Sequence, residues 1–449
     1  MPPTAVIMLD TSEAWEPPDR PTRPRHASQR LPAIGLVLVT VFALVTGAQP
    51  VTPLTPSAVL RDDGISNIRS FGHDLYLIRQ PDLTQAVLES YRMPDSARRW
   101  ASRVDAHSQF VGLSDERVVL TVAGPNQDST PTLVGLDAAS GAQVWRRTGY
   151  KPSFYGLSGA PGVVLADPDT PGADDQQEQQ RSDRQLVGID ARTGDIRWSF
   201  VTPAGSARSY EFSELGFAEY RVEIAELDPD GTLRVRSAES AEVVRTAKVD
   251  DPGHVGGFSI SGDRLLTNGW GQTGQPGGAM FDLVTGRRLW ERAAETAGGP
   301  IWWCGRMLLC AWGERTIAAL DPDTGRELWR LDGWRSLEQI DDKHLLATLS
   351  APNPDDPSLG GLVVDAATGR TVRRIVGWDP VGRQAAGPVL LVASRSLSGP
   401  SQVARLNLDT GALTVFGTAE HWYIAPKCVT MPTVLVCQHG RVSVWPLPA

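Results

Sequence analysis

The segment that decides the fold is LVGIDARTGDIRW, residues 186–198, because the chain repeats its pattern. An apolar strand leads into an Asp-x-x-Thr-Gly turn, and a second strand then ends in tryptophan. A recurring phrase of this kind is the signature of a repeat architecture. Clear copies are LVGLDAASGAQVW (133–145), MFDLVTGRRLW (280–290) and IAALDPDTGRELW (317–329), weaker copies lie at 362–374 and 403–416, and degenerate copies lie at 87–100 and 233–245.

The spacing of the turn residue gives the size of the repeated unit. It runs from 39 residues, between Asp282 and Asp321, to 53 residues, between Asp137 and Asp190. Two further short apolar runs precede each phrase, for example within 301–309, so each repeat holds four strands. Four-stranded units of this length predict an all-β fold, a β-propeller. Eight repeats carry the phrase, and we predict eight blades, with seven as the alternative count.

A ninth segment, residues 422–446, supplies three strands but lacks the turn phrase. Closing a ring commonly pairs the two ends of a chain in one blade, because this avoids exposed strand edges. A strand around Ala58–Arg61 would complete such a blade. Because the phrase is missing, we predict that one candidate segment is incomplete or lies outside the ring.

The repeated phrase has the chemistry of a hairpin turn. The aspartate carboxylate accepts backbone N–H bonds across the turn, and the glycine takes a positive φ at little cost. The tryptophan presents a wide flat ring that fills the gap between neighbouring blades. The predicted turn residues are Asp137, Gly141, Asp190, Gly194, Asp282, Gly286, Asp321, Gly325, Asp365, Gly369 and Gly411. The predicted blade-docking residues are Trp100, Trp145, Trp198, Trp290 and Trp329.

Residues 31–48, LPAIGLVLVTVFALVTGA, contain no charged side chain. At about 1.5 Å per residue they span about 27 Å as a helix, which is just enough for the hydrocarbon core. Four arginines precede the run and no basic cluster follows it, so the N-terminus is expected in the cytoplasm and the bulk outside. We predict a single-pass helix in the plasma membrane. A cleaved signal peptide, with small residues at Thr46 and Ala48, and a buried core helix are the alternatives.

The segments around this run differ in composition. Residues 1–30 are polar and rich in proline, which predicts a disordered cytoplasmic tail. Residues 49–60 are also rich in proline and are interpreted as an extracytoplasmic linker, followed by the propeller domain over 61–449. The formal net charge of −9 lies wholly after residue 30. Because an acidic body repels phosphate backbones, nucleic acid is not expected as a partner.

The four cysteines form two local pairs, and neither pair has the C-x-x-C spacing typical of zinc or dithiol chemistry. Each pair brackets a predicted hairpin, and an oxidising compartment outside the cell would allow a disulfide in each. Buried free thiols are the alternative. The possible disulfides are Cys304 with Cys310 and Cys428 with Cys437.

The Leu-Asp-x-x-Thr-Gly-x-x-x-Trp phrase resembles the repeat of pyrroloquinoline-quinone (PQQ) dehydrogenases. It is also similar to that of BamB, the lipid-anchored propeller of the outer-membrane assembly machine. The resemblance covers roughly residues 65–446, and the chain resembles the single-pass PQQ-like propellers of actinobacteria. Quinoprotein enzymes of this kind carry adjacent cysteines over the cofactor and a calcium ion held by Glu, Asn and Asp. No Cys-Cys dipeptide occurs here, and none of those ligand positions can be matched, so no cofactor is expected.

Other sites of chemistry are also missing from the sequence. The seven histidines show no i, i+3 or i+4 pairing, and neither a Gly-x-Ser-x-Gly elbow nor a phosphate loop occurs. Trp302, Trp303, Trp312 and Trp334 cluster around one repeat, where core packing between blades is the prediction and a stacking surface the alternative.

We therefore predict a membrane-anchored extracytoplasmic propeller that binds a protein or cell-envelope ligand, without catalysis. The predicted binding surface is formed by the loops on one face of the ring. A PQQ-dependent oxidoreductase and an extracytoplasmic sensor are the alternatives.

Overall fold

A computed structural model divides the chain into two units, Met1–Val51 and Thr52–Ala449, and only the second is described. The tail predicted over 1–30 and the helix predicted over 31–48 therefore lie outside the described residues. Within the described part of the chain, no helix is long and apolar enough to cross a bilayer. The description covers residues 54–447 except 62–63, 83–84, 115, 123–129, 154–156, 159–161, 170–182, 217–218, 251, 253, 271–275, 294–299, 306–307, 314–315, 335, 349–359, 384–388, 395–399, 420–426 and 439–440.

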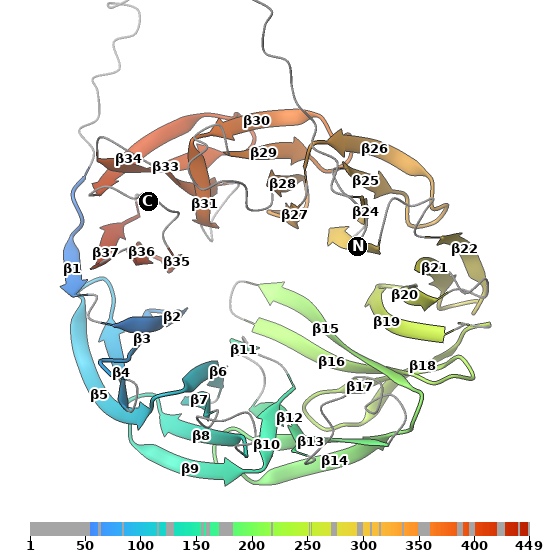
Figure 1. Cartoon of the computed structure of the whole chain (residues 1–449), viewed down its shortest axis with the longest axis horizontal. Coiled ribbons are helices and arrows are strands. Elements are labelled where there is room, and N and C mark those ends of the chain that lie inside the picture. Colours follow the sequence, from blue (N-terminus) through green and yellow to red (C-terminus); the bar gives the residue numbers. More distant parts are fainter. Residues whose placement is uncertain are drawn as a thin grey trace, which may run out of the picture. The chain divides into compact units, whose positions relative to one another are not determined.

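The described residues form nine sheets of mainly antiparallel strands, which are the blades of a propeller (Figure 1). Blade 1 consists of β2 (Ile65–Phe71), β3 (Asp74–Arg79), β4 (Gln85–Arg92) and β5 (Ala97–Asp105). Blade 2 consists of β6 (Ser108–Ser114), β7 (Arg117–Val122), β8 (Thr132–Asp137) and β9 (Gln143–Thr148). Blade 3 consists of β10 (Tyr150–Pro152), β12 (Val163–Pro168), β13 (Arg184–Asp190) and β14 (Ile196–Thr202), while the short β11 (Leu157–Ser158) pairs in parallel with β6.

The next three blades repeat this four-stranded order. Blade 4 consists of β15 (Ala207–Gly216), β16 (Glu219–Leu227), β17 (Thr232–Ser237) and β18 (Val243–Lys248). Blade 5 consists of β19 (His254–Ser261), β20 (Arg264–Trp270), β21 (Pro276–Asp282) and β22 (Arg288–Ala293). Blade 6 consists of β23 (Ile301–Gly305), β24 (Leu308–Trp312), β25 (Thr316–Leu320) and β26 (Glu327–Asp332).

The last three blades include the one that joins the two ends of the domain. Blade 7 consists of β27 (Ser336–Gln339), β28 (His344–Thr348), β29 (Gly360–Asp365) and β30 (Thr371–Val376). Blade 8 consists of β31 (Trp378–Arg383), β32 (Val389–Ser394), β33 (Ser401–Asn407) and β34 (Leu413–Ala419). Blade 9 consists of β35 (Lys427–Thr430), β36 (Val434–Gln438) and β37 (Arg441–Pro446), with β1 (Ala58–Arg61) as its outermost strand.

The burial of each strand follows its place in the blade. The second strands β3, β7 and β32 are buried at nearly every position, because neighbouring blades cover both of their faces. The outermost strands β5 and β26 alternate between buried and exposed residues. The two apolar runs that precede each phrase therefore mark the first and second strands, and the phrase itself covers the third strand and the start of the fourth.

One hydrophobic cluster lies at each junction between successive blades. At the first junction, Tyr76 and Leu88 of blade 1 pack with Phe110 and Leu120 of blade 2. Corresponding clusters lie at the seven following junctions. The last cluster joins blade 9 to blade 1 and closes the ring. Figure 1 shows the blades following one another around it in sequence order.

The predicted count of eight blades, with seven as the alternative, is wrong because all nine segments are blades. Strand β1 pairs with β37 in the register Ala58 to Val444, so blade 9 obtains its fourth strand from the start of the domain. A blade closed in this way needs no turn between its third and fourth strands, and the phrase is therefore missing from it. The strand suggested around Ala58–Arg61 is present, and the propeller begins before residue 61.

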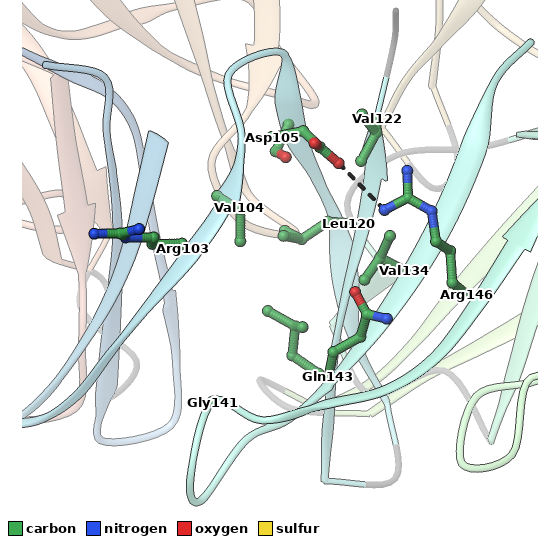
Figure 2. A pocket seen from close by; sticks show the side chains of 11 residues that line it. Arg103, Val104, Asp105, Leu120, Val122, Val134, Gly141, Gln143 and Arg146 are labelled. Carbon is green, nitrogen blue, oxygen red and sulfur yellow. Dashed lines mark hydrogen bonds and ion pairs between the residues drawn. The ribbon is translucent and has the colours of Figure 1, made fainter. Parts of the chain in front are cut away.

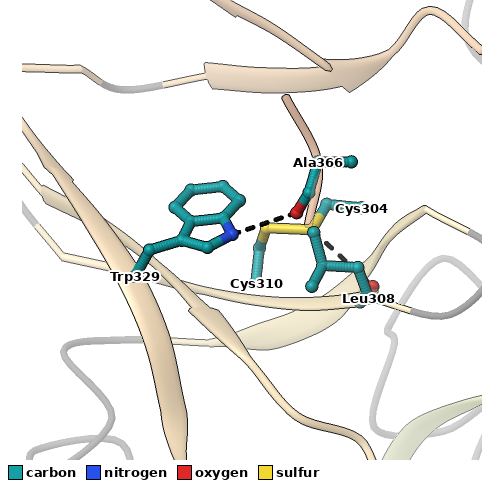
Figure 3. Close-up of a disulfide and its surroundings, with 5 residues drawn as sticks. All are labelled: Cys304, Leu308, Cys310, Trp329 and Ala366. Atoms are coloured by element: carbon teal, nitrogen blue, oxygen red, sulfur yellow. Dashed lines mark hydrogen bonds between the residues drawn. A yellow bond between two sulfur atoms is a disulfide. The ribbon is translucent and has the colours of Figure 1, made fainter. Parts of the chain in front are cut away.

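Both cysteine pairs are disulfides that join the first two strands of a blade. Cys304 and Cys310 link β23 to β24 in blade 6, and Cys428 and Cys437 link β35 to β36 in blade 9. Cys304 and Cys310 are buried beside Trp329 in the cluster between blades 6 and 7 (Figure 3).

Candidate functional site

The strand order gives the propeller two different faces. In a four-stranded meander, the connections between strands one and two and between strands three and four lie at the same end of the blade. We call that end the turn face. The connection between strands two and three, and the one that leads to the next blade, lie at the opposite end, which we call the loop face.

The turn face is built from copies of one hydrogen-bonded turn. In blade 7 the Oδ1 atom of Asp365 accepts the backbone N–H of Thr368 at 2.8 Å and the Thr368 hydroxyl at 2.6 Å. The backbone N–H of Gly369 donates to the Asp365 carbonyl at 2.8 Å. Gly369 has a φ of +67°, which glycine adopts easily. The backbone hydrogen bond to Oδ1 recurs at Asp137, Asp190, Asp282, Asp321 and Asn407.

These hydrogen bonds stabilise the charged form of the turn aspartates. The Thr368 hydroxyl is the largest influence on Asp365, and together with backbone N–H groups it holds the pKa of Asp365 below the ordinary 3.8. Burial acts in the opposite direction but is outweighed. The turn aspartates are therefore partnered within their own turns, where they stabilise the hairpins.

Each docking tryptophan reaches the turn of the following blade. The indole Nε1 donates to a backbone carbonyl there. For all of them except Trp198, whose partner turn has Ala241, the ring lies where a Cβ on the turn glycine would stand. An ideal Cβ on Gly325, for example, would lie 2.8 Å from Cδ2 of Trp290. The hydrogen-bonded pairs are Trp100 with Ala138 (2.9 Å), Trp145 with Ala191 (2.8 Å), Trp198 with Glu239 (3.1 Å), Trp290 with Pro322 (2.7 Å) and Trp329 with Ala366 (3.0 Å).

The loop face has connections of widely different length. On the turn face, the third and fourth strands are joined by the short segments 138–142, 191–195 and 366–370. On the loop face, the second and third strands are joined by 169–183 in blade 3 and by 313–315 in blade 6. Variation concentrated at one end of a repeated scaffold is typical of a binding surface.

Three partly exposed tryptophans gather at the loop face between blades 6 and 7. Trp302 is the second residue of the first strand of blade 6, and Trp312 is the last residue of the second strand. Trp334 lies just after the end of the fourth strand. The ring centroids of Trp302 and Trp312 lie 3.8 Å apart. Trp312 and Trp334 pack on the cluster that contains the Cys304–Cys310 disulfide. We call Trp302, Trp312 and Trp334 the tryptophan cluster.

The side chains of the tryptophan cluster are partly exposed, and two of them, Trp312 and Trp334, pack on the hydrophobic core. The Nε1 atom of Trp312 is buried and has no hydrogen-bond partner among the described residues. Trp303 lies on the other side of β23 and packs between blades 5 and 6. The prediction of core packing between blades thus fits Trp303, and it also fits Trp312 and Trp334, which pack between blades 6 and 7. All four side chains are partly exposed, and Trp302, Trp312 and Trp334 lie at the face where the connections vary.

A buried polar network lies between blades 3 and 4. The Arg208 side chain is only 5% exposed and donates to Asp167 at 2.9 Å and to the Thr202 hydroxyl at 2.6 Å. The Thr202 hydroxyl donates to Glu226 at 2.6 Å, and Arg236 donates to the other Glu226 oxygen at 2.8 Å. Buried charges that are paired in this way hold two blades together. Sequence reasoning missed this network, because its members lie on five strands with no shared motif.

Two further titratable groups bind backbone amides and have structural roles. His344 Nδ1 lies 3.0 Å from both carboxylate oxygens of Asp341 in the first turn of blade 7. Burial raises the pKa of Asp341, but the hydrogen bond from His344 and backbone N–H groups outweigh it and lower the pKa. Burial raises the pKa of Glu211, whose Oε1 accepts the N–H of Ile260 from blade 5 at 2.9 Å. Within the described ranges, no group of His, Cys, Asp and Glu is arranged to hold a metal ion.

Comparison with protein families gives one match. A family model described as outer membrane protein assembly factor BamB matches residues 85–331, which is more than half of the chain. Curated proteins give no match to the sequence.

Solved structures resemble the chain at the level of fold. BamB from Moraxella catarrhalis is 16% identical, covering 82% of this chain and 98% of its own, with a TM-score of 0.40. Sqt1 from Saccharomyces cerevisiae is 9% identical, covering 89% of this chain and 100% of its own, with a TM-score of 0.45. The quinohemoprotein alcohol dehydrogenase ADHIIG from Pseudomonas putida HK5 is 12% identical, covering 82% of this chain and 69% of its own, with a TM-score of 0.37. At these identities and scores, the likenesses carry no argument about function.

Proposed function

The chain belongs to the family described as outer membrane protein assembly factor BamB, and from this premise we propose that it is a binding or scaffold module without catalysis. Its ligand is a protein or a component of the cell envelope. The observation that carries the proposal is the partly exposed tryptophan cluster on the loop face. Flat aromatic rings with little conformational freedom are the side chains that most often anchor a bound partner.

We propose in addition that the propeller is held outside the cell by an N-terminal anchor. The uncharged run over 31–48 and the arginines before it support a single helix with a cytoplasmic N-terminus. The two disulfides support an oxidising compartment. A protease added to wall-free intact cells should degrade the propeller, while the same protein protected until lysis would contradict this location.

Photo-crosslinking from the full-length protein in its own membrane tests the binding face. A photoreactive amino acid at Trp302 should give a discrete adduct, because that side chain lies at the edge of the tryptophan cluster. The matched control carries the same group at Val284, which is 75% exposed on the turn face. Equal adducts from both positions, or none from Trp302, would overturn the assignment of the binding face.

The absence of catalysis is tested separately. The full-length protein is mixed with PQQ and calcium, and dye reduction is followed with alcohols and sugars as substrates. We expect no reduction above the rate of free PQQ. Reduction that saturates with substrate would replace the scaffold proposal with an oxidoreductase.

A further inference from the structure

The start of the propeller domain is attached to the outer rim of the ring. The N–H of Leu54 donates to the Phe416 carbonyl at 3.0 Å, and the N–H of Thr418 donates to the Leu54 carbonyl at 3.0 Å. These bonds join Leu54 to β34, the outermost strand of blade 8. The chain then continues as β1, the outermost strand of blade 9 (Figure 1). The domain is therefore tethered at the rim of blades 8 and 9.

The tether before Leu54 is short. Ala48 is the last residue of the uncharged run that we propose as a membrane anchor, and Leu54 is the sixth residue after it. Even a fully extended chain covers only about 3.3–3.6 Å per residue, so Leu54 lies within about 22 Å of the end of the run. The lipid headgroup layer takes up about 5–7 Å of that distance. The proposed anchor therefore requires the rim of blades 8 and 9 to lie close to the lipid surface.

The rim at this point is uncharged. Residues 54–60 and β34 contain no acidic or basic side chain. Leu54 and Val59 are both 50% exposed on this strip. Val244 on the outermost strand of blade 4 is 48% exposed, so apolar exposure alone does not distinguish the strip from the rest of the rim. Its lack of charge beside the tether allows close approach to a bilayer, because no charged group there has to lose its hydration.

Exposed arginines stand on both sides of the uncharged strip. In blade 7, Arg373 and Arg374 are exposed on the outermost strand β30. Arg373 borders blade 8 directly, because an ideal Cβ on Gly411 would lie 3.8 Å from the Cδ atom of Arg373. In blade 1, Arg103 is exposed on the outermost strand β5. None of these three arginines forms an ion pair with a described residue.

The cations on the outermost strands of blades 2, 3 and 4 are paired instead. Arg146 lies 3.3 Å from Asp105, and Figure 2 shows Arg103 turned away from this pair. The other ion pairs are Arg147 with Asp195, Arg197 with Asp190, Arg245 with Asp263 and Lys248 with Asp230. A carboxylate partner leaves a cation little charge to offer a ligand. Within the described part of the rim, the guanidinium groups that lack a carboxylate are therefore concentrated beside the tether.

We infer that the rim of blades 8 and 9 docks on a lipid bilayer that contains anionic headgroups. The inference rests on the membrane anchor proposed above, which brings the rim to the lipid. The guanidinium groups of Arg103, Arg373 and Arg374 bind lipid phosphates, while Leu54 and Val59 face the bilayer between them. The short tether keeps the rim at an effective concentration of about a millimolar or more, so a weak contact is sufficient. The loop face and its tryptophan cluster remain open to a partner.

Single probes on the full-length protein test the inference in vesicles of phosphatidylcholine and phosphatidylglycerol. The four native cysteines form disulfides, so a cysteine introduced as Val59→Cys can be labelled alone with an NBD fluorophore. A nitroxide on the lipid headgroup should quench this probe. Val244→Cys is the matched control, because Val244 is as exposed as Val59 but lies on blade 4, and its probe should stay bright. Equal quenching of both probes, or quenching of neither, refutes the docking.

Extraction of the same vesicles with alkaline carbonate separates the docking from the anchor. We expect the full-length protein to remain in the vesicles. Protein that carbonate releases would refute the anchor and, with it, the premise of the docking. Protein that is retained while the probe at residue 59 stays unquenched refutes the docking alone.

Arginine variants of the Val59→Cys protein identify the attraction. Arg103→Gln and Arg374→Gln should each weaken the docking equilibrium, taken from the quenched fraction, about fivefold. Replacing phosphatidylglycerol by phosphatidylcholine should also reduce quenching. Arg287→Gln is the matched control and should change nothing, because Arg287 is exposed in blade 5 and forms no ion pair with a described residue. Quenching that neither the two variants nor the lipid change reduces, or that Arg287→Gln reduces equally, refutes the binding of anionic lipid by this rim.

Discussion

The turn face and the loop face are made by the same nine sheets, yet only one of them is uniform. On the turn face, Trp329 is 9% exposed and donates a hydrogen bond to Ala366 of the following blade. On the loop face, Trp312 packs on the same hydrophobic cluster but stays partly exposed, and its Nε1 atom has no partner among the described residues. One indole N–H is hydrogen-bonded across the junction between blades, and the other is buried without a partner among the described residues.

This difference separates stability from recognition. The turn face repeats one solution, the docking tryptophan, at five of the nine junctions, where it fixes how one blade meets the next. The loop face carries no such requirement, so its connections differ without changing the ring. The comparison predicts that substitutions on the turn face lower stability, while equivalent substitutions on the loop face affect binding.

Replacing the two tryptophans gives the largest expected contrast. Trp329→Ala removes a buried ring and a hydrogen bond between blades, and should lower the free energy of unfolding by about 3–5 kcal/mol. Trp312→Ala removes a ring that is partly exposed and has no hydrogen bond to lose, and should cost about 1–2 kcal/mol. Urea unfolding monitored by circular dichroism measures both. Equal losses would show that the two faces do not differ in this way.

Two glycines give a smaller contrast of the same kind. Gly369 has a φ of +67°, and a Cβ there would lie 2.6 Å from Cδ2 of Trp329. Gly369→Ala therefore adds a steric clash to backbone strain and should cost about 3 kcal/mol. Gly333 on the loop face has a φ of +84°, but a Cβ there would meet nothing within 4 Å. Gly333→Ala should cost only the backbone strain of about 1–2 kcal/mol in the same urea experiment.

Most of the propeller can be predicted from the sequence, because nearly every blade has its own local sequence pattern. The turn phrase and the apolar runs lie within one repeat, so four strands per blade are visible without knowledge of distant contacts. The number of blades, in contrast, cannot be predicted from the pattern of any single repeat. It depends on the pairing of Ala58–Arg61 with Arg441–Pro446, across almost the whole domain, and no turn phrase marks that blade.

The candidate sites are harder to predict for the same reason. The network of Asp167, Arg208 and Glu226 combines residues from two blades whose spacing follows no motif. The tryptophan cluster was visible in the sequence, but the separation of Trp303 from the other three depends on which side of β23 each ring occupies.

The turn face should also respond to acid in a way that one substitution can isolate. The pKa of Asp365 lies below the ordinary 3.8, mainly through the Thr368 hydroxyl. Because the folded value is the lower one, this stabilisation is complete above pH 3.8 and is lost as the pH falls through the folded value. Melting temperatures measured between pH 2.5 and 7 should therefore fall at the acid end.

Asp365→Asn should make that decline shallower, because an amide accepts the same hydrogen bonds without titrating. Blade 8 already has this arrangement, with Asn407 accepting the N–H and the hydroxyl of Thr410 at 2.8 and 3.0 Å. The cost at neutral pH should be about 1 kcal/mol or less, since a charged acceptor is exchanged for a neutral one. An unchanged acid profile would show that Asp365 is not one of the groups responsible.

The smallest expected effect is a gain in stability where the turn face departs from its own pattern. Ala241 occupies the glycine position in blade 4 with a φ of +60°, and the hydrogen bond from Trp198 to this turn is the longest of the five, at 3.1 Å. An L-residue in this conformation costs about 1–2 kcal/mol of stability, which glycine would relieve. The greater freedom of glycine in the unfolded chain offsets about 0.5–1 kcal/mol of that gain. Ala241→Gly should therefore stabilise the protein by about 0.5–1 kcal/mol in urea unfolding.

Ala142→Gly, next to the turn glycine of blade 2, should destabilise it by a similar amount. If both variants destabilise, the left-handed position of Ala241 is not under strain.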